Sequence, residues 1–124
     1  MNEHIIIGDG IAGMSAAQYI RGKKPEDEIV IVTNAPQPFY YRAALTNYLS
    51  KRLCDSELLA IPLEQWDQLN IKRVYGSVNS LDSDQKTVHL AGGKVLSYDR
   101  LLIATGCSAR RLKTRRRDPQ RGVN

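Results

Sequence analysis

The sequence predicts an α/β protein with a parallel sheet built through a βαβ unit and followed by an antiparallel β-meander. Three observations indicate it. A β-branched run at 5–7 ends at a glycine, and residues 11–21 then carry apolar side chains at near-helical spacing. A second β-branched run occupies 28–32. From 71 to 97 the pattern changes to several short strands around a glycine turn.

The first three elements form the βαβ unit. Residues 5–7 are an unbroken isoleucine run, which is typical of a strand buried on both faces. The helix over 11–21 ends at the Gly-Lys-Lys-Pro run at 22–25. Since a strand, a helix and a strand follow within about thirty residues, their crossover is right-handed and their strands are parallel.

The remaining elements are shorter. Two prolines make 34–38 irregular, and helices are predicted at 43–51 and Leu63–Leu69. The later strands are Ile71–Tyr75, 78–81, Thr87–Leu90, Val95–Ser97 and 101–104, with a hairpin turn at 91–94. We expect 5–8, 28–32 and 101–104 to be parallel neighbours with the first helix packed on them. We expect 71–97 to form a separate antiparallel unit.

Length and composition indicate one domain and exclude several classes of protein. No stretch approaches the roughly 20 apolar residues of a membrane span. The start, Met1 to His4, has no basic region before a long apolar one, which argues against a cleaved signal peptide. Cys54 and Cys107 are far apart and form no CxxC, which argues against a dithiol centre, a zinc site or a disulfide scaffold. A cytoplasmic location fits best.

The net charge of +5 comes from the last fifteen residues, which contain seven of the eighteen basic residues and one acid, Asp118. Residues 112–124 are interpreted as a basic tail or interdomain segment. Basic tails also bind nucleic acid, but no aromatic stacking platform accompanies this one. We therefore do not expect nucleic acid to be a partner.

The chemistry begins at a G-x-G-x-x-G motif, Gly8 to Gly13, directly between the first strand and the first helix. Gly8 allows the tight turn, Gly10 lets a pyrophosphate approach the backbone, and Gly13 lets the helix pack on the sheet. The helix N-terminus offers N–H groups and a partial positive charge. This context favours a Rossmann-like dinucleotide site over a merely structural turn. We expect the Asp9 carboxylate to point away from the pyrophosphate.

The usual ribose-binding carboxylate is missing. About twenty residues past the glycines a carboxylate should follow the second strand, but Thr33, Asn34 and Ala35 are there. Asn34 is a candidate for hydrogen bonding to the ribose. The alternative, that it only shapes the turn before Pro36, is equally consistent with the sequence.

Three segments together resemble the pyridine nucleotide–disulfide oxidoreductase superfamily. They are the glycine loop, the run Pro-Phe-Tyr-Tyr-Arg at 38–42, and the run Tyr-Asp-Arg-Leu-Leu-Ile-Ala-Thr-Gly at 98–106. The pattern is similar to the branch with rubredoxin reductases, NADH oxidases and the flavin portion of nitrite reductase. The resemblance implies that residues 1–111 are the N-terminal part of an FAD-binding domain, incomplete in length, that NAD(P)H is the reductant of the full-length enzymes, and that no membrane is involved.

The resemblance also implies residue roles. The pyrophosphate of FAD would lie on the glycine loop, and Arg42 would reach the phosphate side, unless it forms only a surface salt bridge. The backbone of Val78 would meet the adenine, and the turn after the last strand would pass the FAD. The cofactor-binding residues so implied are Gly8, Gly10, Ile11, Ala12, Gly13, Arg42, Val78, Ala104, Thr105 and Gly106.

The sequence departs from the family at several positions. Ala35 stands where relatives carry the ribose-binding Glu, and Ala43 where a Pro is common. Cys107 is interpreted as a small buried residue rather than a reactive thiol. A second G-x-G-x-x-G and the later flavin-contacting segment are also missing, so the sequence contains half a flavin site.

These observations leave one leading function and one alternative. The leading hypothesis is the FAD-binding segment of an NAD(P)H-dependent flavoprotein oxidoreductase that passes electrons through FAD to an unidentified acceptor: a protein, oxygen or an attached metal centre. No residue qualifies as catalytic or as a metal ligand, and His4 and His89 are interpreted as structural. The alternative is a truncated, non-catalytic nucleotide-binding Rossmann-like module, which would bind a nucleotide weakly or not at all.

Overall fold

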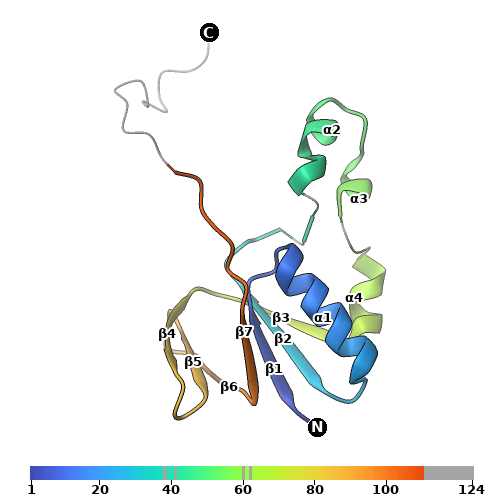
Figure 1. The fold of residues 1–124 in the computed structure, drawn as a ribbon. Coiled ribbons are helices and arrows are strands. Elements are labelled where there is room, and N and C mark those ends of the chain that lie inside the picture. The colour runs from blue at the N-terminus through green and yellow to red at the C-terminus, as the bar shows by residue number, and fades with distance from the viewer. Residues whose placement is uncertain (38, 41, 60, 62, 111–124) are drawn as a thin grey trace, which may run out of the picture.

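The computed structural model describes residues 1–37, 39–40, 42–59, 61 and 63–110 (Figure 1). Residues 112–124, the predicted basic tail, lie outside the described residues. The elements in chain order are β1 (Glu3–Ile7), α1 (Ile11–Lys23), β2 (Glu28–Thr33), η1 (Arg42–Ala44, a 3-10 turn), α2 (Leu45–Leu49), α3 (Asp55–Leu58), α4 (Leu63–Leu69), β3 (Ile71–Tyr75), β4 (Val78–Asp82), β5 (Thr87–Leu90), β6 (Val95–Ser97) and β7 (Arg100–Ile103).

The strands form two sheets. A four-stranded sheet has the order β3-β2-β1-β7, and a three-stranded sheet has the order β4-β5-β6. β1 pairs in parallel with both β2 and β7, which confirms the predicted core of the fold. The strands β4, β5 and β6 pair antiparallel, which confirms the meander.

The prediction for Ile71–Tyr75 was wrong. This strand, β3, does not join the antiparallel unit but extends the parallel sheet beside β2, with Ile29 opposite Ile71 and Thr33 opposite Tyr75. A parallel partner needs a crossover of a dozen or more residues, and the segment from 34 to 70 supplies one. Because β3 directly precedes the hairpins in the sequence, its pattern alone grouped it with them.

The parallel sheet is covered on both faces, because successive residues of a strand point to opposite sides. Ile6, Ile29 and Ile31 pack against Met14 and Ala17 of α1 on one face. On the other face, the alternate residues of β1 and β2 form a second buried cluster with two residues of β5, Val88 and Leu90. Figure 1 shows α1 on one side of the sheet and the β4–β6 sheet on the other. Burial on both faces explains why β1 and β2 lack polar alternation.

The segment between β2 and β3 is less regular than predicted. The helix expected over 43–51 consists of the η1 turn followed by the five-residue α2, and it ends before Lys51, whose φ is 61°. α3 was not predicted. α4 matches the predicted Leu63–Leu69.

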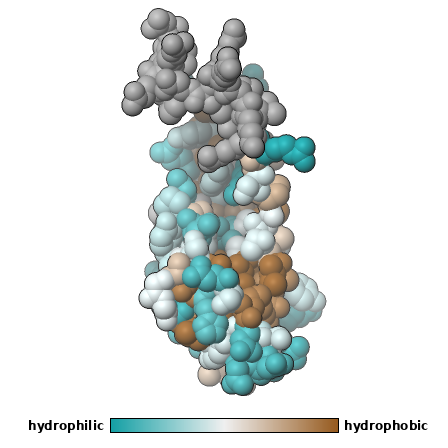
Figure 2. Space-filling view, turned by 90° about the vertical axis from the view of Figure 1, so that its left-hand side faces the viewer, coloured by the Kyte–Doolittle hydropathy of each residue, from teal (hydrophilic) through white to brown (hydrophobic). Residues whose placement is uncertain are grey.

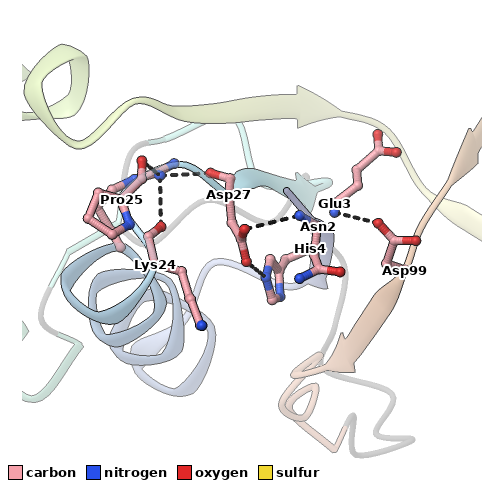
Figure 3. A network of polar contacts seen from close by, with 8 residues as sticks. Asn2, Glu3, His4, Lys24, Pro25, Asp27 and Asp99 are labelled. Carbon is pink, nitrogen blue, oxygen red and sulfur yellow. Dashed lines mark hydrogen bonds and ion pairs between the residues drawn. The ribbon is translucent and has the colours of Figure 1, made fainter.

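The amino-terminal ends of the strands carry a buried polar network (Figure 3). Asp27 Oδ1 accepts a hydrogen bond from the Asn2 backbone N–H at 3.0 Å, and Asp27 Oδ2 lies 2.7 Å from His4 Nε2. These bonds lower the pKa of Asp27 from 3.8 to about 2, the Asn2 amide having the larger effect. Glu3 N donates to Asp99 Oδ2 at 2.8 Å, which fixes the start of β7 beside β1.

Arg21, near the end of α1, ties the helix to both neighbouring segments. Its guanidinium donates to five backbone carbonyls, at 2.7 to 3.4 Å, belonging to Lys24, Pro25, Asp27, Leu69 and Asn70. The ends of α1 and α4 and the start of β2 are thereby fixed relative to one another.

The last strand is the exposed edge of the sheet. Figure 2 shows the side of the molecule that bears β4–β6, and hydrophobic surface gathers over part of it. In β7, Leu102 is 39% and Ile103 is 58% exposed.

Cys107 is exposed as well, so the prediction of a buried residue was wrong. It follows β7 in an extended segment that leaves the sheet, where the described residues provide no layer to cover it.

Candidate nucleotide-binding site

A groove of about 740 Å³ opens at the carboxyl ends of β1, β2 and β7. In open parallel sheets this edge is where ligands bind. The structure brings ten of the eleven predicted site residues together in the lining of this groove: Gly8, Gly10, Ile11, Ala12, Asn34, Arg42, Val78, Ala104, Thr105 and Gly106. The other predicted residue, Gly13, is buried behind the groove.

Gly8 and Gly13 are required by packing. A Cβ on Gly8 would lie 2.1 Å from the carbonyl oxygen of Ala104, and the φ of Gly8 is +109°. A Cβ on Gly13 would lie 2.0 Å from the carbonyl oxygen of Gly8. Backbone atoms cannot yield at such distances, so these two glycines set the contact between α1, β1 and the end of β7.

Gly10 is different, because a Cβ there would meet nothing within 4 Å. It is the N-cap residue of α1, and within the described residues no side chain caps this helix end. The first turn also lacks acidic residues. The N–H groups that begin the helix at Ile11 and Ala12 therefore face the groove with the positive end of the helix dipole, an arrangement suited to an anion.

The loop after β2 forms another wall of the groove. Thr33 is buried, and its Oγ1 accepts a hydrogen bond from the Ala35 N–H at 3.1 Å. Asn34 is exposed between them and lines the groove. The wall thus offers the Asn34 amide side chain, next to Ala35 in the same loop.

Two further predicted residues reach the groove from distant parts of the chain. Arg42, at the start of the η1 turn, is exposed and lines the groove, so its planar cation is available to a phosphate. Val78 begins β4 and is half-buried beside Gly76 and Ser77, which line the groove as well. Their positions are consistent with the predicted roles, which remain predictions.

Sequence reasoning missed Arg73, which comes from β3 and bonds to Asp9 of the glycine loop. The distance from Arg73 Nη2 to Asp9 Oδ2 is 3.0 Å. The signal that could have found it is the place of β3 beside β2. An arginine at the centre of β3 lies within reach of the glycine loop and of the loop after β2. The Asp9 carboxylate thus bonds to Arg73, while Asp9 also lines the groove. That it points away from the pyrophosphate stays a prediction.

Among the residues that the structure describes, the histidines and acidic residues form no second centre. His4 belongs to the network at the opposite edge of the sheet, and His89 Nε2 lies 3.1 Å from Thr87 Oγ1. Within the described parts of the chain, no three His, Cys, Asp or Glu side chains are grouped to hold a metal ion. In the same residues, every helix is too short or too polar to span a membrane.

The fold is that of an α/β domain of the dinucleotide-binding type. A family model described as pyridine nucleotide-disulphide oxidoreductase matches residues 2–122. The chain belongs to this family, as its motifs indicated.

Curated relatives and solved structures agree with this assignment. The chain is 31% identical over 110 residues to an NADH-rubredoxin oxidoreductase of Clostridium acetobutylicum, covering 88% of this chain and 28% of the relative. It is 31% identical over 114 residues to the ferredoxin reductase component of a chlorobenzene dioxygenase of Cupriavidus sp., covering 90% and 28%. The structure matches the covalent putidaredoxin reductase–putidaredoxin complex with a TM-score of 0.86 at 28% identity, covering 90% of this chain and 27% of that one. The chain therefore spans just over a quarter of the length of these relatives.

Proposed function

We propose that this chain is the FAD-binding segment of an NAD(P)H-dependent flavoprotein oxidoreductase that passes electrons to a separate acceptor. One observation supports this most directly: the uncapped N-terminus of α1 faces a groove beside a glycine, Gly10, whose missing Cβ leaves open space. That space and the helix dipole are what a pyrophosphate requires.

The residues around the groove fit FAD. The pyrophosphate would lie on Gly8, Gly10 and the amides of Ile11 and Ala12, with Gly13 holding the helix close to the sheet. Arg42 would add positive charge on the phosphate side. The adenosine would extend toward Asn34 and Val78, and the flavin end would pass the turn at Ala104, Thr105 and Gly106. These assignments rest on the family resemblance, and all of these residues except Gly13 line the groove at the carboxyl ends of the neighbouring strands β2, β1 and β7.

In this proposal the described residues bind and orient the cofactor and do not act as acids or bases. A bound FAD would supply the redox chemistry by which electrons of NAD(P)H reach the acceptor, and the residues of the groove would hold it. The names of the similar proteins include rubredoxin and ferredoxin as partners. A separate redox partner is therefore the acceptor proposed here.

The proposal extends to domain organisation and location. Residues 1–111 would be the N-terminal part of the FAD-binding domain, and 112–124 a basic tail or interdomain segment. Cys54 and Cys107 are free thiols, which agrees with a reducing compartment such as the cytoplasm.

A titration with ADP tests the site, because ADP carries the part of FAD that the glycine loop would hold. ADP should shift the backbone amide signals of residues 8–13, and FAD should compete for the same amides. Gly10→Val should abolish the shifts by filling the space of the phosphates. Gly22→Val is the matched control, because Gly22 is on the same helix and a Cβ there also meets nothing within 4 Å. That variant should bind as the original chain does.

Two results would contradict the proposal. If millimolar ADP leaves the amides of 8–13 unchanged, the groove binds no nucleotide and the alternative of a non-binding Rossmann-like module is correct. If Gly10→Val binds ADP as well as Gly22→Val does, the nucleotide lies elsewhere.

A further inference from the structure

Arg73 connects the two loops that line the groove. Its Nη2 donates to the carboxylate of Asp9 at 3.0 Å, to the carbonyl of Ala35 at 2.7 Å and to the carbonyl of Gln37 at 2.6 Å. Asp9 belongs to the glycine loop, whereas Ala35 and Gln37 belong to the loop after β2. One guanidinium nitrogen thus bonds to both walls.

The first consequence concerns charge. Asp9 lies in the glycine loop and lines the groove, so an unpaired carboxylate there would repel a pyrophosphate. The side chains of Asp9 and Arg73 are only 12% and 27% exposed, so water screens their interaction weakly. The pair brings the local charge of the loop to neutral and leaves the dipole of α1 to attract the anion.

The second consequence concerns position. Beyond Thr33 the described loop has left the sheet, and its carbonyls at 35 and 37 have lost the ladder partners that a strand provides. Arg73 supplies a donor to both carbonyls from the neighbouring strand β3. Asn34, which faces the groove, is carried by the segment that these bonds hold.

We propose that Arg73 is a positioning residue of the nucleotide site, acting through Asp9 on the phosphates and through the 35–37 backbone on the adenosine. The inference rests on the proposed function, because it assumes that an adenosine diphosphate occupies the groove. Arg73 itself does not line the groove, so it acts through residues that do.

Two ligands separate the two effects: inorganic pyrophosphate, which needs only the glycine loop, and ADP, which also needs the loop after β2. The affinities of the full chain, Arg73→Gln, Arg73→Lys, Asp9→Asn and the double variant would be measured from amide shifts. Arg73→Gln should weaken both ligands, ADP by about tenfold to a hundredfold, because bonds to a charged group are lost. Adding Asp9→Asn to that variant should restore pyrophosphate binding but leave ADP weak.

Arg73→Lys keeps the charge but cannot reproduce the planar fork. It should therefore bind pyrophosphate nearly as the original chain does and ADP more weakly. Amide signals of β4–β6 report whether each variant is folded, because that sheet does not contain Arg73 or its partners. If Arg73→Gln fails to fold, the pyrophosphate and ADP affinities of Arg73→Lys and Asp9→Asn can still be compared with those of the original chain.

The outcomes are distinguishable. If the original chain binds ADP and the folded Arg73 variants bind both ligands equally well, this inference is overturned while the proposed function stands. If Asp9→Asn does not restore pyrophosphate binding in the Arg73→Gln background, the role assigned to charge is overturned. If the original chain binds neither ligand, the proposed function fails and this inference fails with it.

Discussion

The two ends of the parallel sheet differ in how their backbone and polar groups are satisfied. At the amino-terminal edge, Arg21 donates to five carbonyls, and Asp27 is bonded to the Asn2 amide and to His4. At the carboxyl edge, no described side chain caps α1, and space is left open beside Gly10. One edge is closed by the protein itself, and the other presents groups that a ligand can satisfy.

The comparison indicates that the two edges have different roles: the amino-terminal edge stabilises the fold, and the carboxyl edge is available to a ligand. Polar groups that are satisfied internally contribute to stability and leave nothing for a ligand. Unsatisfied N–H groups at a helix start contribute little to stability but bind anions. Substitutions at the amino-terminal edge should thus change the free energy of unfolding, whereas substitutions that touch only the groove should change affinity.

The largest expected effect is on stability, at the buried contact where α1 packs on β1 and Gly8. Gly13→Ala would place a Cβ 2.0 Å from the Gly8 carbonyl oxygen, so α1 must move away from β1. We expect a loss of about 3 kcal/mol or more, the upper range for overpacked sites. Urea unfolding measures it, with Gly22→Ala as the control on the same helix. A Gly13→Ala variant as stable as that control would show that the helix can shift at no cost.

The next effect is at the amino-terminal edge. Arg21→Met keeps an unbranched apolar stem but removes the donors to five carbonyls. We expect a destabilisation of about 1–3 kcal/mol, because the partly buried carbonyls of Leu69 and Asp27 would lose their bonds to this guanidinium. Thermal or urea unfolding checks this. ADP-induced shifts in residues 8–13 should persist below the unfolding transition, and their loss would mean that the two edges are not independent.

A smaller effect should appear as pH dependence. The pKa of Asp27 is lowered from 3.8 to about 2 in the folded chain, so the folded state favours the ionised carboxylate. Its stabilisation is present above pH 3.8 and is lost as the pH falls toward 2. The urea midpoint should decrease over this range, and Asp27→Asn should flatten the decrease. An unchanged slope in that variant would assign the acid sensitivity to other carboxylates.

The smallest effect on stability is expected in the groove. Ala35→Glu restores a carboxylate at the position where the family carries its ribose ligand, and the backbone bonds of Ala35 remain available. ADP should bind about tenfold more tightly, since a hydrogen bond to a charged group is added. Amide-shift titrations measure the gain, with Ala35→Gln as the uncharged control. A weaker affinity than that of the original chain would show that the ribose does not reach this loop.

Much of the fold followed from local pattern. The unbroken apolar runs of β1 and β2 indicated strands buried on both faces, and the glycine motif located the turn into α1. The similar run of β7 also indicated a buried strand, and this was wrong, because β7 is an edge strand whose residues are mostly exposed. The resemblance to the oxidoreductase family rested on three separated segments and is confirmed by the match over residues 2–122. The predicted residues that follow β1, β2 and β7 meet in the groove because parallel strands bring their carboxyl ends to one edge.

Three of the errors share a physical cause, since each of them depended on contacts between distant parts of the chain. The sequence near Ile71–Tyr75 indicates a strand but not its partner strand, β2. The paired residues Ile29 and Ile71 are 42 residues apart in the sequence. Arg73 was missed for the same reason. Cys107 was judged by residue type, whereas its exposure depends on what covers the segment after β7.

The pairing of β7 with β1 also has a consequence for the order of folding. β1 meets β2 across about 25 residues, whereas the bond between Glu3 and Asp99 closes a loop of 96. Because contacts across longer loops form later and more slowly, β7 should dock last. Gly8 packs on the carbonyl of Ala104, directly after β7, so the glycine loop acquires its final shape only in that step. Competence to bind a nucleotide should therefore arise together with completion of the sheet, and kinetic refolding experiments would detect both in the same phase.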